Sequence, residues 1–203
     1  MYKSFVEQTG MKGHLTIHKV VNGEEELVYD DQNVITSGFG WTLAHLYGNV
    51  GSQTITDYQI DRFQLGVSGN AALQVSTTYE LSGPLSSSEE YTTDGDSNLL
   101  AVSSDLYLTD ENVEEQVFAK IPFSKVTKIS DSSVRYTIFI DEDSCNNLTR
   151  DGSDASLSEI GLFIKNPRNK PTTESVLVAI RTFSNITKTS DFGLLFRWTI
   201  SFG

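Results

Sequence analysis

Two histidines come closest, by type and spacing, to a metal site. His14 and His18 are four residues apart, so in a strand both side chains would lie on one face. Imidazole nitrogen is a common ligand for zinc. No cysteine or third histidine lies near the pair, and His45 falls in a predicted helix, where packing or capping explains it. We therefore expect neither a metal nor a cofactor.

Two acidic clusters offer the oxygen ligands that calcium prefers. One contains Asp94 and Asp96, and the other is the run at residues 141–143. A calcium loop of the EF-hand type needs glycine at its sixth position. That position is Leu99 in the first cluster and Asn146 in the second. Both clusters are therefore interpreted as solvated loops.

Nucleophilic and phosphate-binding motifs are also missing from the sequence. No serine stands in a G-x-S-x-G elbow, and Cys145 lies in a polar turn without a histidine nearby. Gly66 and Gly69 are not followed by the Gly-Lys pair of a phosphate-binding loop. The prediction is that the protein is not an enzyme.

The composition argues against nucleic acid and membrane as partners. The 203 residues include 27 acidic and 15 basic side chains, which gives a formal charge of −12. This charge repels phosphate backbones and anionic lipids. The start at residues 1–5 lacks the apolar run of a secretory signal, and a single cysteine cannot form an intrachain disulfide. We expect folding in a reducing cytoplasm.

The strongest structural pattern lies at residues 192–202. Large apolar residues alternate there with smaller or polar ones, as in a half-buried β-strand. Such a strand must pack against a second sheet or a partner subunit. The apolar positions are Phe192, Leu194, Phe196, Trp198, Ile200 and Phe202.

Local turn and cap signals define the N-terminal part of the chain. Residues 13–29 are predicted to form a hairpin, because Asn22-Gly23 suits a turn with positive φ angles. Thr36 or Ser37 is a candidate cap for a short helix that runs to Tyr47 and stops at the following glycine.

Further strands, separated by turn residues and without helical periodicity between them, complete the pattern. They are predicted at 63–67, 117–121, 133–141, 158–165 and 176–183. This pattern is typical of an antiparallel sandwich or barrel. We predict an all-β antiparallel β-sandwich, jelly-roll-like, with one short helix and an N-terminal hairpin.

The domain organisation follows from the same pattern. Residues 1–12 are predicted to form an N-terminal arm, and residues 13–203 a single β-sandwich domain. The stretch at about 85–115 is rich in Ser, Thr, Asp and Glu and is interpreted as an acidic surface insertion. Arm and insertion are expected to dock onto partners, since flexible segments can order on binding.

Several segments, taken in order, resemble a known family. They are residues 33–38 (NVITSG), 63–69 (FQLGVSG), 158–163 (SEIGLF), 177–183 (LVAIRTF), 186–191 (ITKTSD) and 198–202 (WTISF). Together they resemble the tailed-bacteriophage virion proteins described as tail, baseplate or minor structural components, which are frequent in cyanophage genomes. The resemblance spans residues 30–84 and 116–203.

The resemblance implies a structural protein of the virion, in the tail, baseplate or neck, that folds in the host cytoplasm before assembly. It implies a homo-oligomer that also binds other virion proteins. A protein that decorates the capsid or anchors a fibre is the alternative within this class. An alternative of another class is a carbohydrate-binding module that recognises a host surface glycan through exposed aromatic side chains. Trp41 and Trp198 are both expected in the core, which disfavours the module.

The residues of the family-like motifs are expected to have structural roles. Glu159 would be a partly buried carboxylate that pairs with Arg181 or Lys188 and so sets the register of the sheet. The complete set comprises Glu159, Gly161, Phe163, Arg181, Phe183, Lys188 and Trp198.

Overall fold

A computed structural model describes residues 10–48, 55–69, 78–86, 91–93, 107–109, 117–164 and 175–203. Within these ranges strands predominate, and α2 is the only α-helix. The elements are β1 (Lys12–Val21), β2 (Glu24–Ile35), α2 (Ser37–Tyr47), η1 (Ile55–Tyr58), β3 (Ile60–Gly66), β4 (Tyr91–Thr92), β5 (Tyr107–Thr109), β6 (Val117–Lys120), η2 (Phe123–Lys125), β7 (Val126–Ser130), β8 (Ser133–Ile140), β9 (Thr149–Arg150), β10 (Ser153–Asp154), β11 (Leu157–Ile164), β12 (Val176–Ile186) and β13 (Gly193–Ser201).

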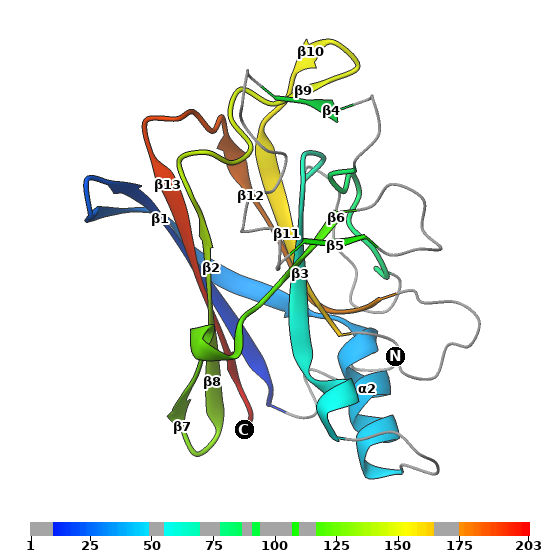
Figure 1. The fold of residues 1–203 in the computed structure, drawn as a ribbon. Coiled ribbons are helices and arrows are strands. Elements are labelled where there is room, and N and C mark those ends of the chain that lie inside the picture. The colour runs from blue at the N-terminus through cyan, green and yellow to red at the C-terminus, as the bar shows by residue number, and fades with distance from the viewer. Residues whose placement is uncertain are drawn as a thin grey trace.

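Ten strands form one antiparallel ladder, in the order β5-β6-β3-β11-β12-β2-β1-β13-β8-β7 (Figure 1). The short strands β10, β9 and β4 form a second, small sheet. β2 joins the two halves of the large sheet. Its residues Val34 and Ile35 pair with β12, whereas the rest of the strand pairs with β1.

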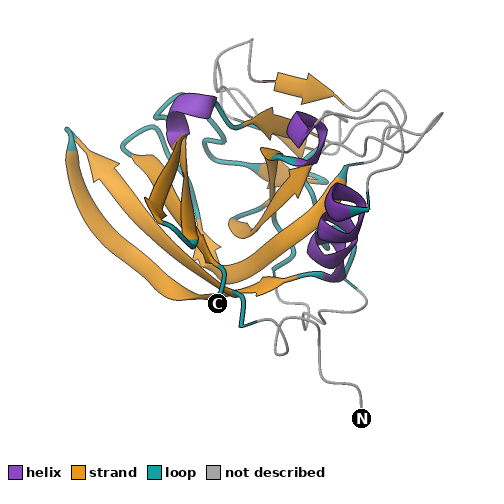
Figure 2. Ribbon diagram, turned by 90° about the horizontal axis from the view of Figure 1, so that it is seen from below, coloured by secondary structure: helices purple, strands orange, loops and turns teal. Residues whose placement is uncertain are grey.

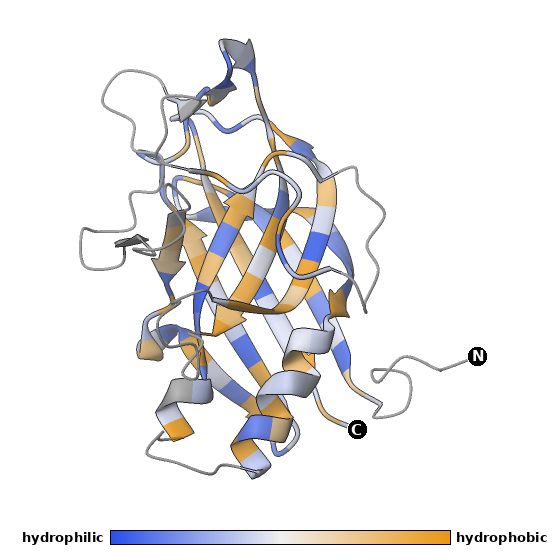
Figure 3. Ribbon diagram, turned by 90° about the vertical axis from the view of Figure 1, so that its right-hand side faces the viewer, coloured by the Kyte–Doolittle hydropathy of each residue, from blue (hydrophilic) through white to orange (hydrophobic). Residues whose placement is uncertain are grey.

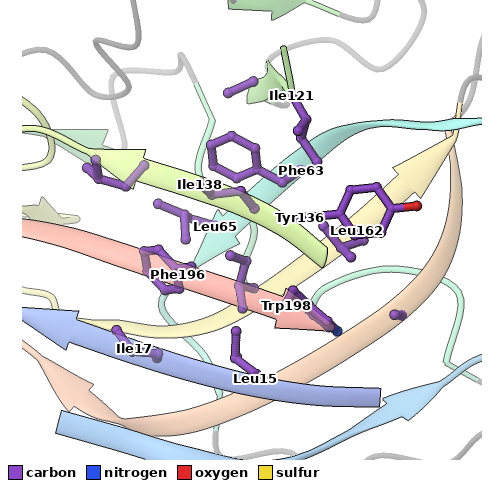
Figure 4. Close-up of a cluster of buried hydrophobic side chains, with 14 of the residues drawn as sticks. Leu15, Ile17, Phe63, Leu65, Ile121, Tyr136, Ile138, Leu162, Phe196 and Trp198 are labelled. Carbon is purple, nitrogen blue, oxygen red and sulfur yellow. The ribbon is translucent and has the colours of Figure 1, made fainter. Parts of the chain in front are cut away.

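The large sheet curves into a trough whose inner face packs on itself (Figure 2). β3 lies near one end of the ladder and β8 near the other, yet both contribute to the same buried cluster. Phe63 and Leu65 of β3 point into it, as do Tyr136 and Ile138 of β8 (Figure 4). Residues 121–125 then carry the chain from β6 across to β7. The core is therefore enclosed by a single curled sheet.

The structure confirms the all-β antiparallel fold with one short helix and an N-terminal hairpin. The sandwich or jelly-roll arrangement is not confirmed, because the ladder is continuous through ten strands. A strand that takes part in both halves, as β2 does, is one way in which packed sheets form a corner. Most of the acidic insertion at 85–115 and residues 1–9 of the predicted arm at 1–12 lie outside the described residues, so the predicted domain limits stay predictions.

The alternating terminal strand is confirmed and lies inside the sheet, between β1 and β8. Leu194, Phe196, Trp198 and Ile200 are completely buried. Hydrophobic and hydrophilic residues alternate along the strands (Figure 3), as expected for a sheet with one face on the core. Phe202 departs from the pattern, since 39% of its surface is exposed.

The hairpin of β1 and β2 turns at Asn22 and Gly23, whose φ angles are +51° and +84°. Two positive φ angles match the turn predicted from this dipeptide. The outer part of the hairpin projects from the body of the domain (Figure 1). It exposes Val21, Leu27 and Val28.

The helix α2 begins and ends where the sequence predicts, with Thr36 as N-cap and Gly48 as C-cap. The hydroxyl of Thr36 does not cap the helix; it donates to the carbonyl oxygen of Leu177 in β12, at 2.5 Å. A Cβ on Gly38 would lie 2.0 Å from the same oxygen. Glycine at this position therefore lets the helix pack directly on the sheet backbone. No helix within the described ranges combines the length and hydrophobicity needed to cross a membrane.

Candidate functional site

An apolar pocket of about 730 Å³ lies at the end of the trough beside α2. It is formed by residues from α2, η1, β3, β6, the β6–β7 connection, β7 and β8, and by the residue that follows β13. Its lining residues are Phe39, Thr42, Leu43, Leu46, Thr56, Tyr58, Gln59, Ile60, Asp61, Lys120, Ile121, Pro122, Phe123, Val126, Val134, Tyr136 and Phe202. The volume and the predominance of apolar groups fit a binding pocket.

Exposed apolar side chains gather around this pocket. Phe123 and Phe202, which line it, are 77% and 39% exposed. Tyr47 and Ile55, each next in sequence to a lining residue, are also largely exposed. An apolar concavity bordered by exposed apolar groups is characteristic of a surface that binds a partner.

Two polar groups of the lining are engaged with protein neighbours. The hydroxyl of Thr42 donates to the carbonyl oxygen of Gly38 at 2.8 Å, and Asp61 accepts from the guanidinium of Arg62 at 2.8 Å. Burial raises the pKa of Tyr136 to about 12, which moves its phenol further from ionisation. This arrangement suits the binding of apolar groups rather than acid–base chemistry.

Sequence reasoning did not identify this pocket. Its lining is drawn from elements far apart in the chain, and spacing within one segment cannot reveal such an assembly. The nearest sequence signal is Phe202, the last large residue of the alternating strand, which the pattern places in the core and the structure places at the pocket.

Glu159 is fully buried, but the ion pair expected for it is not formed. Its carboxylate accepts hydrogen bonds from the backbone N–H groups of Gly83 at 2.7 Å, Ser82 at 3.0 Å and Ser68 at 3.4 Å. In the register of β11 and β12, Arg181 is opposite Ile160. Because neighbouring residues of a strand face opposite sides, Arg181 points away from the carboxylate.

Glycines around Glu159 leave room for this contact. A Cβ on Gly66 would lie 2.5 Å from the Glu159 carboxylate, and one on Gly69 would lie 2.0 Å from the carbonyl oxygen of Ser158. The family-like segments at 63–69 and 158–163 thus form one hydrogen-bonded unit. This unit ties residues 81–85 to the edge of β3, where the N–H of Leu85 donates to the carbonyl oxygen of Leu65.

Gly161 and Phe163 lie on the same strand and have packing roles. A Cβ on Gly161 would lie 2.7 Å from side-chain atoms of Leu81 and Phe163. The ring of Phe163 meets that of Phe118 edge to face, with centroids 5.1 Å apart. These contacts fill the second buried cluster, on the other face of β11.

Arg181 and Phe183 connect β12 to β2 through Tyr29. Arg181 forms an ion pair with Asp31 and donates to the Tyr29 hydroxyl. Phe183 packs between the rings of Tyr29 and Phe196, at centroid distances of 6.0 and 6.2 Å. The two motif residues therefore hold together strands that are no longer hydrogen-bonded as a ladder.

Lys188 lies in the connection between β12 and β13, where it is 2% exposed and does not contact Glu159. Its ammonium group donates to the Asn146 side chain and to the Thr189 carbonyl, both at 2.8 Å. Burial lowers its pKa, and the carboxylates of residues 141–143 partly offset this. The loop interpreted from sequence as solvated thus covers a buried lysine. Cys145, in the same loop, is also buried, which raises its pKa to about 12.

Stability is expected to fall at alkaline pH through Tyr136 and Cys145. A folded-state pKa above the unfolded value contributes stability that is complete below the unfolded pKa and is lost as pH rises through the folded one. These two groups lose their contributions between about pH 9 and about 12. The lowered pKa of Lys188 acts in the opposite sense. Urea unfolding from pH 8 to 11 measures the sum.

Tyr136→Phe should flatten this dependence above pH 10, by up to about 1.4 kcal/mol per pH unit. Tyr47→Phe is the matched control, because the Tyr47 side chain is 85% exposed. Equal pH slopes in the two variants would contradict the assignment.

The two histidines of β1 contact acidic residues of β2. His14 lies 2.6 Å from Asp30, and His18 lies 3.6 Å from Glu25. Glu25 also binds Arg197 through two hydrogen bonds of 2.7 Å, which lower the pKa of Glu25. Within the described ranges, no group of three or more His, Cys, Asp or Glu side chains is placed to hold a metal ion.

Of the two tryptophans expected in the core, one is buried and the other lies at the margin of the core. Trp198 is completely buried. Trp41 is partly buried and stacks on His45, with centroids 4.0 Å apart. Trp41 also packs against the main buried cluster.

The motif residues therefore do not converge on one site: each lies in the core or at a strand junction, away from the pocket lining.

Comparison of the chain with protein-family models, with curated proteins and with solved structures finds no match.

Proposed function

We propose that the protein is a structural component of a tailed-phage virion, in the tail, baseplate or neck, and that it acts by assembling with copies of itself and with other virion proteins. The observation that carries the proposal is the apolar pocket with its exposed apolar border. A rigid β scaffold that presents such a surface is suited to protein–protein contact.

The sequence adds two supporting observations. The family-like segments resemble virion proteins, and several of their residues form the buried contacts of Glu159 and Lys188 and the ion pair of Arg181 with Asp31. A formal charge of −12 favours solubility before assembly, because like-charged subunits repel one another until specific contacts form. Capsid decoration or fibre anchoring is the alternative within this class.

Replacement of two exposed apolar side chains at the pocket should weaken self-assembly. We expect the purified protein to form a discrete oligomer in light scattering, and the double variant Ile55→Ser, Phe123→Ser to dissociate at least about tenfold more readily, since apolar contact area is lost. Both side chains are more than 70% exposed, so the fold should be preserved.

The matched control is Leu27→Ser, Val28→Ser on the projecting hairpin, where both side chains are also exposed. This variant should keep the wild-type mass. A wild-type monomer at all concentrations would refute self-assembly. Mass spectrometry of purified particles from a host that produces the corresponding phage tests the virion assignment separately.

A further inference from the structure

The segment that precedes the described domain joins it at the pocket. A Cβ on Gly10, the first described residue, would lie 3.5 Å from the Cα of Gly203. The neighbouring residue, Phe202, lines the pocket. Residues 1–9, the part of the predicted arm (1–12) that precedes the described residues and is called the N-terminal arm below, are therefore attached beside the pocket border.

We propose that the N-terminal arm of one copy of the chain occupies the apolar pocket of a second copy. The inference rests on the self-assembly proposed above and specifies which segment makes the contact. It accounts for an open apolar pocket and an attached apolar segment at the same end of one domain.

The composition of the arm matches the pocket. Tyr2, Phe5 and Val6 are large apolar side chains, as are most residues of the lining. The positive charge of Lys3 and the negative charge of Glu7 cancel, so the arm has no net charge. The chain's formal charge of −12 therefore comes from residues outside the arm. The arm is thus a segment that approaches another acidic copy with little electrostatic repulsion.

The length of the arm is sufficient to reach the pocket of a neighbour. Three polar residues, 7–9, separate Gly10 from the first apolar residue, Val6. At about 3.3 Å per extended residue, Val6 and Phe5 could reach at most roughly 13 and 17 Å from Gly10. Gly10 lies beside Gly203, next to the lining residue Phe202, so an arm that extends away from this point could reach an adjacent copy. Nine extended residues span about 30 Å, enough to reach an adjacent subunit.

Disulfide trapping between two full-length variants tests the proposal. Ser4→Cys places a thiol in the arm and spares its apolar residues, and Lys120→Cys places one on an exposed residue of the pocket lining. Cys145 should not compete, because it is fully buried and burial raises its pKa to about 12. Oxidation of the mixed variants is expected to give a covalent heterodimer on a non-reducing gel.

Two controls define the background. Ser153→Cys lies on β10, at the opposite end of the molecule from α2 (Figure 1), and should not trap the Ser4→Cys arm. Adding Phe5→Ser and Val6→Ser to the Ser4→Cys variant should reduce trapping by Lys120→Cys to the same background.

The outcomes separate the two proposals. If light scattering shows an oligomer but trapping does not exceed the Ser153→Cys background, the arm proposal is refuted and self-assembly stands. If the double variant Ser4→Cys, Lys120→Cys forms only an intramolecular disulfide and the mixture forms none, the arm fills its own pocket and the proposal is also refuted. A protein that remains monomeric in light scattering refutes self-assembly and arm exchange together.

Discussion

Glu159→Gln is expected to lower the free energy of unfolding by about 3 kcal/mol, because a hydrogen-bonded buried carboxylate is replaced by an amide. The carboxylate accepts from three backbone N–H groups, two of them within 3.0 Å. The glutamine NH₂ would face some of these donors and leave them unpaired. Urea denaturation at pH 7 measures the change.

Glu26→Gln is the matched control for Glu159→Gln. It removes the same formal charge from an exposed residue of β2, so its effect should stay within about 0.5 kcal/mol. Similar midpoints for the two variants would show that the hydrogen bonds of Glu159 contribute little. A loss confined to Glu159→Gln would establish the carboxylate as the connection between residues 82–83 and β11.

Local sequence patterns predicted the elements of the fold where a single segment contains the whole signal. The alternation over residues 192–202 identified β13, and Asn22-Gly23 identified the hairpin turn. The helix limits were also predicted, because the cap and the terminal glycine adjoin the apolar residues. β7 was missed: its sequence, VTKIS, is mostly exposed and lacks a regular apolar alternation.

The partners of buried polar residues could not be predicted in this way. Charge suggested that Glu159 would bind Arg181 or Lys188, but strand register and turn geometry place these three side chains in separate environments. The pairing order of the strands is equally hidden from local pattern, and with it the curl of the sheet. The candidate pocket depends on that curl, because it collects residues from both ends of the ladder.

The contact between α2 and β12 is expected to influence both the stability of the protein and its proposed function. α2 forms one wall of the pocket through Phe39, Leu43 and Leu46, and the helix is held against β12 at Gly38. A change at this contact should therefore affect both the folding free energy and self-assembly. The exposed pocket residues are different, since their replacement should affect assembly alone.

Gly38→Ala is expected to destabilise the protein by about 2 kcal/mol or more, although alanine is the better helix former by about 1 kcal/mol. The added Cβ would lie 2.0 Å from the carbonyl oxygen of Leu177 and 2.9 Å from the Val176 side chain, so helix or strand must shift. Urea denaturation measures the loss, and light scattering should show weaker self-assembly under conditions where the variant remains folded.

Ala44→Gly is the matched control for Gly38→Ala, because it exchanges the same two residue types in the opposite direction at an exposed position of α2. Helix propensity alone predicts a loss of about 1 kcal/mol for this control and a gain for Gly38→Ala. The sign of the Gly38→Ala effect therefore decides between propensity and packing. A stabilised Gly38→Ala variant that assembles normally would show that α2 can move away from β12 without harm, and the pocket wall would then not depend on this contact.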